Sequence, residues 1–172
     1  MALLVLSVVG SDRPGLTKAL AAAVLSVGGN WLESHLSRLG GLYVGSVLVE
    51  LEAGGVEALR QAVRAVDAHG LEVRVAPAGE APEAAGEALD LELVGQDRTG
   101  IVDQVTAVLS GQGANIEAFK TWVSPGPHSG VPFFHLEAHV RLPPALPASQ
   151  LQAALQEISA EIMVDISVTA AR

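Results

Sequence analysis

The stretch Gly10–Gly15 (GSDRPG) returns 85 positions later as Gly95–Gly100 (GQDRTG). The similarity continues through Leu4–Asn30 and Leu89–Asn115, where 10 of 27 aligned residues are identical. An offset of this length is too long for a solenoid repeat and suits two small domains of one kind. The duplication predicts a first domain over residues 1–76, a linker over 77–87 and a second domain over 88–172.

Hydrophobic periodicity predicts the same order of elements in both repeats. In the first repeat it predicts strands over residues 3–9, 31–39, 42–51 and 71–75, and helices over 16–27 and 56–66. In the second it predicts strands over 89–93, 116–124, 134–140 and 163–168, and helices over 101–109 and 150–159. The order βαββαβ is the ferredoxin-like arrangement, an α+β fold with both helices on one face of an antiparallel sheet.

Composition limits the class of protein. The chain has 172 residues, 49 % of them hydrophobic, which suffices for two modest cores but not for a large catalytic domain. It has no cysteine, so disulfides and Cys-based zinc sites are excluded. No apolar run approaches the roughly 18 residues of a membrane span, and the apolar start lacks the basic region of a signal peptide. We expect a soluble, cytoplasmic protein.

The net charge of −9 is unevenly distributed. Residues 1–80 carry six Lys+Arg and eight Asp+Glu, whereas residues 81–172 carry four and eleven. Binding to duplex DNA requires clustered basic residues that neutralise phosphates. The chain's ten basic residues are scattered along the sequence, so we expect no direct contact with nucleic acid. A role at DNA would require a partner protein.

The repeated loop has the features of a carboxylate site. Gly15 and Gly100 stand where helices are expected to begin, and first-turn N–H groups lack intrahelical partners and attract anions. Pro14 suits a first helical turn, where its missing N–H costs nothing. Asp12 and its counterpart Asp97 could cap the helices or accept from an ammonium group. In the second loop Thr99 replaces Pro14, and Thr can itself cap.

An asparagine follows each of these helices, and its amide can both donate and accept hydrogen bonds. Together with the loop it predicts an α-amino-acid site. The candidate ligand-binding residues are Gly10, Asp12, Arg13, Pro14, Gly15, Asn30, Trp31, Gly95, Asp97, Arg98, Thr99, Gly100, Asn115 and Ile116. A purely structural interpretation stands beside this one, because Asp-x-x-Gly is a common helix cap and Gly-Gly-Asn a common helix stop. In that interpretation the two arginines are solvated and Trp31 is a packing residue.

Other chemistry finds little support. His135, Glu137 and His139 alternate along one strand and could converge on a cation, but no fourth ligand is evident, and an exposed polar sheet face explains them as well. The sequence has no Gly-x-Ser-x-Gly elbow, His-Glu-x-x-His helix, Walker loop or dinucleotide fingerprint. We therefore expect no enzymatic activity, no metal and no cofactor.

The Gly-x-Asp-Arg-Pro-Gly loop between a first strand and helix, with Asn30 at the helix end, resembles the ACT domain. The resemblance covers both repeats. A chain of two ACT domains resembles the glycine-cleavage-system transcriptional repressor family. This resemblance implies a regulatory module that binds an amino acid at an interface between two such domains. It also implies glycine as a ligand and a transcription regulator as a partner.

The pattern of the first strand also bears on assembly. Leu3–Val9 is apolar at every position except Ser7, which is typical of a strand buried on both faces. The second repeat has Asp90 and Glu92 in its first strand. We expect the first repeat's open sheet face to be covered by the partner repeat or a second chain, most simply in a homodimer. Two other functions stay open: a ligand-free protein–protein module, and a regulatory subunit of an amino-acid-biosynthetic enzyme.

Overall fold

A computed structural model describes residues 1–67, 70–79, 85–126 and 130–171. The chain divides into two compact units, Met1–Glu80 and Ala81–Arg172. Within the described residues, none of the helices has the length and hydrophobicity needed to cross a lipid bilayer.

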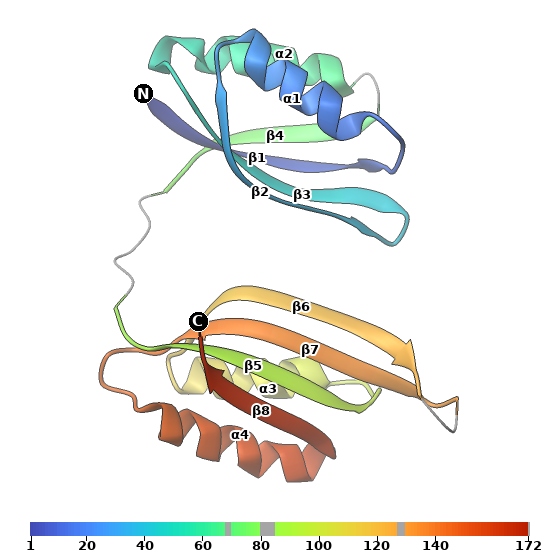
Figure 1. Ribbon diagram of the computed structural model, residues 1–172, viewed down its shortest axis with the longest axis vertical. Coiled ribbons are helices and arrows are strands. Elements are labelled where there is room, and N and C mark those ends of the chain that lie inside the picture. Colours follow the sequence, from blue (N-terminus) through green and yellow to red (C-terminus); the bar gives the residue numbers. More distant parts are fainter. Residues whose placement is uncertain (68–69, 80–84, 127–129, 172) are drawn as a thin grey trace. The chain divides into compact units, whose positions relative to one another are not determined.

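The first unit is a four-stranded antiparallel sheet with two helices on one face (Figure 1). The strand order is β2-β3-β1-β4. Along the chain its elements are β1 (Ala2–Ser11), α1 (Leu16–Ser26), β2 (Asn30–Leu39), β3 (Leu42–Leu51), the short η1 (Ala53–Gly55), α2 (Val56–Asp67) and β4 (Leu71–Pro77). The predicted βαββαβ order is confirmed.

The second unit repeats this architecture, with strand order β6-β7-β5-β8. Its elements are β5 (Ala88–Gln96), α3 (Ile101–Gly111), β6 (Asn115–Pro125), β7 (Pro132–Arg141), α4 (Ala148–Ile162) and β8 (Val164–Ala170). Where the first repeat has only Gly40 and Gly41 between two strands, the second has the longer insert Pro125–Gly130. It begins at the last residue of β6, and its residues 127–129 lie outside the described part of the chain. The ferredoxin-like fold predicted for both repeats is confirmed.

Each unit has its own hydrophobic core between sheet and helices. In β1 the alternate residues Leu4, Leu6 and Val8 are buried beneath α1 and α2. In the second unit the equivalent buried residues of β5 are Leu89, Leu91 and Leu93. Among the described residues no polar or charged side chain is buried. Alternation along the strands places one residue in two in a core and directs the others to the open sheet face.

Backbone details recur at the same offset as the sequence. In each unit the edge strand that follows the first helix carries a β-bulge at its start. The bulge lies between Trp31 and Glu33 in β2 and between Ile116 and Ala118 in β6. The glycine before each first helix is left-handed, with φ of 93° at Gly15 and 95° at Gly100. Only glycine adopts this region without strain. The duplication therefore preserves turn geometry as well as core positions.

The open face of the first sheet is not covered by the unit's own elements. Leu3 is 41 % and Val9 40 % exposed, although the run Leu3–Val9 is apolar. The helices shield only the opposite face of β1. That a partner covers Leu3 and Val9 stays a prediction.

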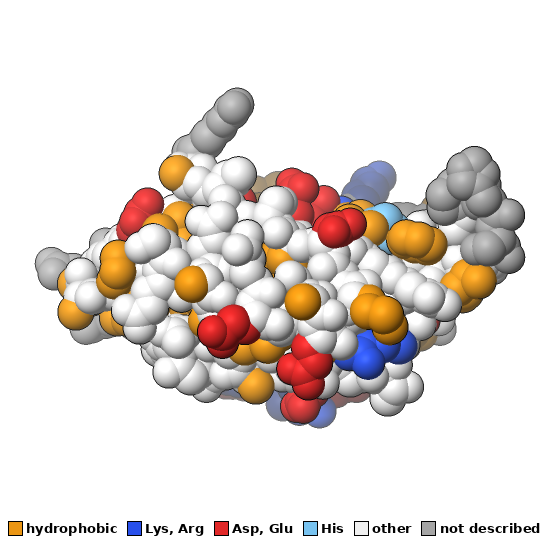
Figure 2. Space-filling view, turned by 90° about the horizontal axis from the view of Figure 1, so that it is seen from below, with side chains coloured by type: hydrophobic (Ala, Val, Ile, Leu, Met, Phe, Trp, Pro, Cys, Tyr) orange, Lys and Arg blue, Asp and Glu red, His pale blue; other side chains and the backbone are white. Residues whose placement is uncertain are grey.

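Acidic side chains are spread over the second unit. Figure 2 shows the side on which α4 lies, where acidic groups and hydrophobic groups are scattered among polar and backbone atoms. This distribution agrees with the eleven acidic and four basic residues of positions 81–172. Clustered positive charge of the kind that binds nucleic acid is not visible on this side.

Candidate functional site

The first loop starts its helix without any side-chain cap. The N-cap of α1 is Gly15, with φ 93° and ψ −4°, and no side chain hydrogen-bonds the first turn. The prediction that Asp12 can cap the helix is wrong, because its carboxylate lies toward Arg38, with Oδ2 3.6 Å from Nε. Pro14 precedes the N-cap, so its predicted place in the first helical turn is also wrong.

The second loop has the same geometry with other contacts. Gly100 is the N-cap of α3, with φ 95° and ψ −3°, and again no side chain caps the helix. The capping predicted for Asp97 and Thr99 is therefore wrong. The Asp97 N–H donates to the carbonyl of Pro132 at 2.8 Å. Arg98 Nη2 donates to Gln104 Oε1 at 3.1 Å, which draws this guanidinium back over its own helix.

Both helix starts face open space. A β-carbon built on Gly15 or Gly100 would have no other heavy atom within 4 Å. The first intrahelical bonds are donated by Ala19 and Gln104, to Gly15 and Gly100 respectively. The N–H groups of the three preceding residues in each helix are left without intrahelical acceptors. Each loop therefore presents accessible donors and the positive end of a helix dipole, which suit a carboxylate.

Two predicted site glycines have a packing role instead. Gly10 and Gly95 are among the candidate ligand-binding residues, because small residues let a ligand approach the backbone. A β-carbon at Gly10 would collide with the carbonyl oxygen of Gly70, where the chain enters β4. One at Gly95 would lie 2.9 Å from Cβ of Val164 in β8. These glycines allow the adjoining strand of their own unit to pack closely.

Arg13 folds over the turn before β4. A β-carbon at Gly70 would lie 2.7 Å from Arg13 Nη2. The guanidinium thus lies close to Gly70, which directly precedes β4. It is placed to add positive charge near the helix start, whereas Arg98 in the second unit turns toward Gln104.

Residues around the two helix starts differ in chemistry. In the first unit the hydroxyls of Thr17 and Tyr43 lie 2.6 Å apart, and Lys18 is the third residue of α1. The second unit has Val102 and Asp103 in place of Thr17 and Lys18. It has Phe134 in place of Tyr43, since Tyr43 pairs with Gly10 as Phe134 pairs with Gly95.

A hollow lies at this position in the second unit. It has a volume of about 460 Å³ beside the start of α3. It is lined by Arg98, Gly100, Ile101, Val102, Asp103, Thr106 and Phe134. The first helix start therefore has Lys18 in its first turn, and the second has Asp103 there, beside a hollow that Arg98 also lines.

Asn30 and Asn115 are the first residues of β2 and β6, which follow the ends of α1 and α3 that lie far from these loops. Helix α1 has 11 residues, and α3 has 11. At 1.5 Å per residue the two ends of each helix lie about 16 Å apart. Within one unit, Asn30 cannot contact an amino acid bound at Gly15, nor Asn115 one bound at Gly100. The structure does not bring the two halves of the predicted constellation together in a single unit.

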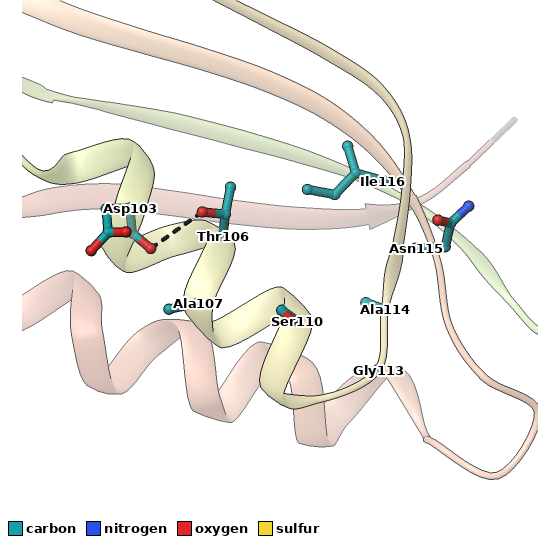
Figure 3. Close-up of a pocket in the computed structure, with 8 residues that line it drawn as sticks. All are labelled: Asp103, Thr106, Ala107, Ser110, Gly113, Ala114, Asn115 and Ile116. Atoms are coloured by element: carbon teal, nitrogen blue, oxygen red, sulfur yellow. Dashed lines mark hydrogen bonds between the residues drawn. The ribbon is translucent and has the colours of Figure 1, made fainter.

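A second hollow lies at the asparagine end of α3 (Figure 3). It measures about 630 Å³ and is lined by Asp103, Thr106, Ala107, Ser110, Gly113, Ala114, Asn115 and Ile116. In Figure 3 Ile116 points toward α3, whereas Asn115 points to the other side of β6. Ile116 is half-buried against the second core. Its counterpart Trp31 packs in the same way on the first core, as the structural interpretation predicted.

The predicted polar face of β7 is present but does not form a metal site. His135 Nε2 lies 2.7 Å from Ser124 Oγ, and its ring stacks on Trp122 with centroids 4.9 Å apart. His139 Nδ1 lies 2.7 Å from Asp90 Oδ1. Within the described residues no group of three potential ligands is placed to hold a metal.

Sequence reasoning missed one ionic cluster at the β6 bulge. Glu117 accepts from Arg141 at 2.6 and 3.1 Å, and Arg141 Nη1 also donates to the carbonyl of Gly86 at 3.3 Å. Hydrogen bonding to Arg141 holds the pKa of Glu117 below its usual range and raises the pKa of Arg141. The cluster depends on the register of β6 against β7, and the bulge that sets this register has no sequence signal of its own.

The chain is similar to one protein family and to solved structures. The ACT domain family model matches residues 2–76. Residues 2–76, which make up most of the first unit, therefore belong to the ACT domain family. The second repeat of the chain has the same fold, which gives the whole a two-domain ACT architecture. A search of curated proteins finds no match.

Two solved structures resemble the whole chain. An unknown protein from Galdieria sulphuraria is 30 % identical with a TM-score of 0.89, and 99 % of both chains is covered. A candidate glycine cleavage system transcriptional repressor is 16 % identical with a TM-score of 0.73, covering 99 % of this chain and 98 % of that one. At that identity the second likeness establishes the fold alone.

Proposed function

We propose that this tandem ACT protein is a non-enzymatic regulator that binds a small amino acid and transmits its occupancy to a protein partner. The observation that carries the proposal is the pair of uncapped helix starts at Gly15 and Gly100. Each offers free first-turn N–H groups to solvent at a left-handed glycine. In an ACT-domain chain these groups are suited to an amino acid's carboxylate.

The first helix start is the better carboxylate site of the two. Lys18 adds a positive charge to the first turn of α1, and Arg13 lies beside the loop. Asp103 stands at the position of Lys18 in the second unit and would repel a carboxylate. We therefore propose that the first unit provides the stronger site.

A complete amino-acid site needs groups that one unit does not bring together. The loop and the asparagine lie at opposite ends of an 11-residue helix. We propose that a second copy of the chain supplies the missing group, in a homodimer that also covers the open face containing Leu3 and Val9. Glycine is the ligand we test first, because a small side chain needs least room at the loop. The protein partner we propose is a transcription regulator.

The test is thermal unfolding of the intact chain with each standard amino acid, glycine first. A ligand present at 100 times its Kd adds about 2.7 kcal/mol to the free energy of unfolding. That corresponds to a rise of about 5 °C or more in Tm for a chain of this size. If no amino acid raises Tm at millimolar concentration, the sensor proposal fails.

A matched pair of variants locates the site. Gly15→Ala and Gly100→Ala each place a methyl group over one helix start in open space, with the same strained φ. We expect Gly15→Ala to reduce the ligand-induced rise in Tm and Gly100→Ala to leave most of it. Equal reductions would show that the units do not differ as proposed.

A second function is favoured by the exposed apolar face of β1. A protein–protein module without ligand needs only such a face and no open helix start. Light scattering separates the two proposals when combined with the amino-acid screen. A stable dimer whose Tm responds to no amino acid supports the ligand-free module. A regulatory subunit of a biosynthetic enzyme would instead co-purify with that enzyme.

A further inference from the structure

Arginines gather in a hollow between α2 and β4 of the first unit, which lie side by side (Figure 1). The hollow measures about 340 Å³ and is lined by Arg60, Val63, Arg64, Val73, Arg74 and Val75. We refer to it as the α2–β4 hollow. It lies apart from the helix starts, on an edge strand of the sheet. Three of the chain's ten basic residues line it, in a protein of net charge −9.

The surroundings of Arg60 and Arg64 differ from those of several other cations. Arg38 faces Asp12, Lys120 faces Glu137 and Arg141 binds Glu117. Arg74 pairs with Glu72, with Nη2 3.1 Å from Oε1. Among the side chains that the structure describes, which do not include that of Asp67, no carboxylate pairs with Arg60 or Arg64.

Like charges one helical turn apart repel each other. Arg60 and Arg64 stand four residues apart in α2 and line the same hollow. A bound anion would relieve this repulsion, because it attracts both guanidinium groups.

Arg60 is held in place before any ligand arrives. Its Nη1 donates to the carbonyl oxygen of Val75 at 3.2 Å, in a half-buried position. A guanidinium has five N–H donors, so most of them are left for an incoming group. The planar fork of arginine matches the oxygens of a phosphate or carboxylate. An anchored arginine loses little side-chain freedom when it binds.

The second unit keeps the apolar part of the hollow and lacks the charges. Buried Leu59 and Val63 of α2 correspond to Leu151 and Leu155 of α4, which aligns Arg60 with Gln152 and Arg64 with Gln156. The strand register aligns Val73 and Val75 with Ile166 and Val168, and Arg74 with Ser167. Packing between helix and strand therefore does not require arginine at these positions.

We propose that the α2–β4 hollow binds an oxyanion, the phosphate or carboxylate group of a small molecule, through Arg60 and Arg64 with Arg74 at the rim. Its volume lies at the lower end of the roughly 300–1,000 Å³ of ligand clefts. The site is separate from the proposed amino-acid site. An oxyanion bound there would give the first unit an additional ligand, for which the second unit has no equivalent site.

The test is an NMR titration of the intact protein at constant ionic strength, with inorganic phosphate and, separately, citrate as probes. We expect saturable shifts of the side-chain N–H signals of Arg60 and Arg64 and of the β4 amides. Signals of Gln152 and Gln156 should stay unchanged. A response to phosphate alone identifies a phosphate site, and a response to citrate alone identifies a carboxylate site. A response to both identifies an oxyanion site of broader selectivity.

Variants taken from the second unit provide the control. Arg64→Gln copies position 156 and keeps a good helix former on the surface of α2. Loss of a charge-assisted hydrogen bond should weaken binding of the responding probe by about tenfold or more. The double exchange Gln152→Arg and Gln156→Arg should create a weaker response in the second unit. No saturable shift at about 10 mM probe, which would nearly fill a site with a Kd of about 1 mM, overturns the proposal. Unchanged affinity in Arg64→Gln overturns it equally.

Discussion

The two units have nearly the same backbone and different surfaces. Their helix-start glycines agree in φ at 93° and 95°, and their edge strands bulge at the same place. Their open sheet faces do not agree. The first carries Leu3, Val5, Ser7 and Val9. The matching positions on the second hold Ala88, Asp90, Glu92 and Val94, so two of the four are acidic there. A duplicated fold thus retains what determines its backbone, while the residues that face solvent or a partner diverge.

The divergence follows from how tightly each position is constrained. A core residue contacts several neighbours, and a left-handed turn excludes nearly every residue except glycine. A residue on an open face has few neighbours in its own unit. Differences at such positions therefore indicate what each unit contacts beyond its own residues. The cation near Gly15, the apolar face of β1 and the arginines of α2 all belong to the first unit.

The largest expected effect is in the cores, where the units should be equivalent. Leu6 and Leu91 are fully buried at matching positions of β1 and β5. Each change to alanine should lower the free energy of unfolding of its own unit by about 2–5 kcal/mol. Denaturant unfolding followed by NMR signals from each unit separates the two. If Leu6→Ala destabilises the second unit as much as the first, the units do not fold independently.

Replacing the closely packed glycines by alanine should destabilise the two units to different extents, by less than the core changes. A β-carbon at Gly10 meets the backbone of Gly70 and Leu71, whereas one at Gly95 meets mainly the side chain of Val164. Overpacking costs about 1–3 kcal/mol, and a side chain moves more readily than backbone. We expect Gly10→Ala to reduce Tm more than Gly95→Ala. The reverse order would mean that β4 shifts more easily than β8.

The sequence predicted the parts of the fold that depend on periodicity. Alternation in β7 and helical spacing in α1 determine which side chains are buried, and both can be read locally. It failed at Asp12, where side-chain capping was expected. The N-cap is Gly15 and the carboxylate lies toward Arg38 from β2, a contact between distant residues.

The candidate site was harder to predict than the fold. The sequence places Asn30 fifteen residues after Gly15, but it does not show that a helix holds them at opposite ends. Likewise Gly10 was assigned to ligand approach, because nothing in the sequence shows that Gly70 lies against it. The contrast between Lys18 and Asp103 could have been found, since the offset of 85 aligns them directly.

Acid should affect the second unit through the Glu117–Arg141 pair. The folded pKa of Glu117 lies below its ordinary value of 4.5 because Arg141 binds the carboxylate. The stabilisation is therefore complete above that ordinary value and is lost as the pH falls through the lowered pKa. Glu117→Gln should flatten the decline in second-unit stability below about pH 4.5. The first unit has Leu32 at this position of its bulge, so it serves as an internal control. If the stability of the second unit falls with pH in Glu117→Gln as it does in wild type, the Glu117–Arg141 pair does not cause the decline.

The smallest expected effect concerns the charge at the helix starts. Lys18→Asp gives the first unit the charge of the second, and Asp103→Lys makes the opposite change. One charge in the first turn of a helix alters the free energy of an interaction there by about 0.3–1 kcal/mol. This corresponds to a change of roughly two- to five-fold in Kd for an amino acid held by its carboxylate. Calorimetric titration of both variants and the double variant with the responding amino acid measures it.

The decisive result is whether each variant binds the amino acid more weakly or more tightly. Lys18→Asp should weaken binding, and Asp103→Lys should strengthen any binding in the second unit. Salt should reduce both effects, because exposed charges are screened over about 10 Å at 0.1 M ionic strength. Uncharged Lys18→Gln should lie between wild type and Lys18→Asp. If Lys18→Asp binds as tightly as wild type at low salt, the carboxylate does not lie at the start of α1. The preference for the first unit would then have to come from the hydroxyl pair of Thr17 and Tyr43.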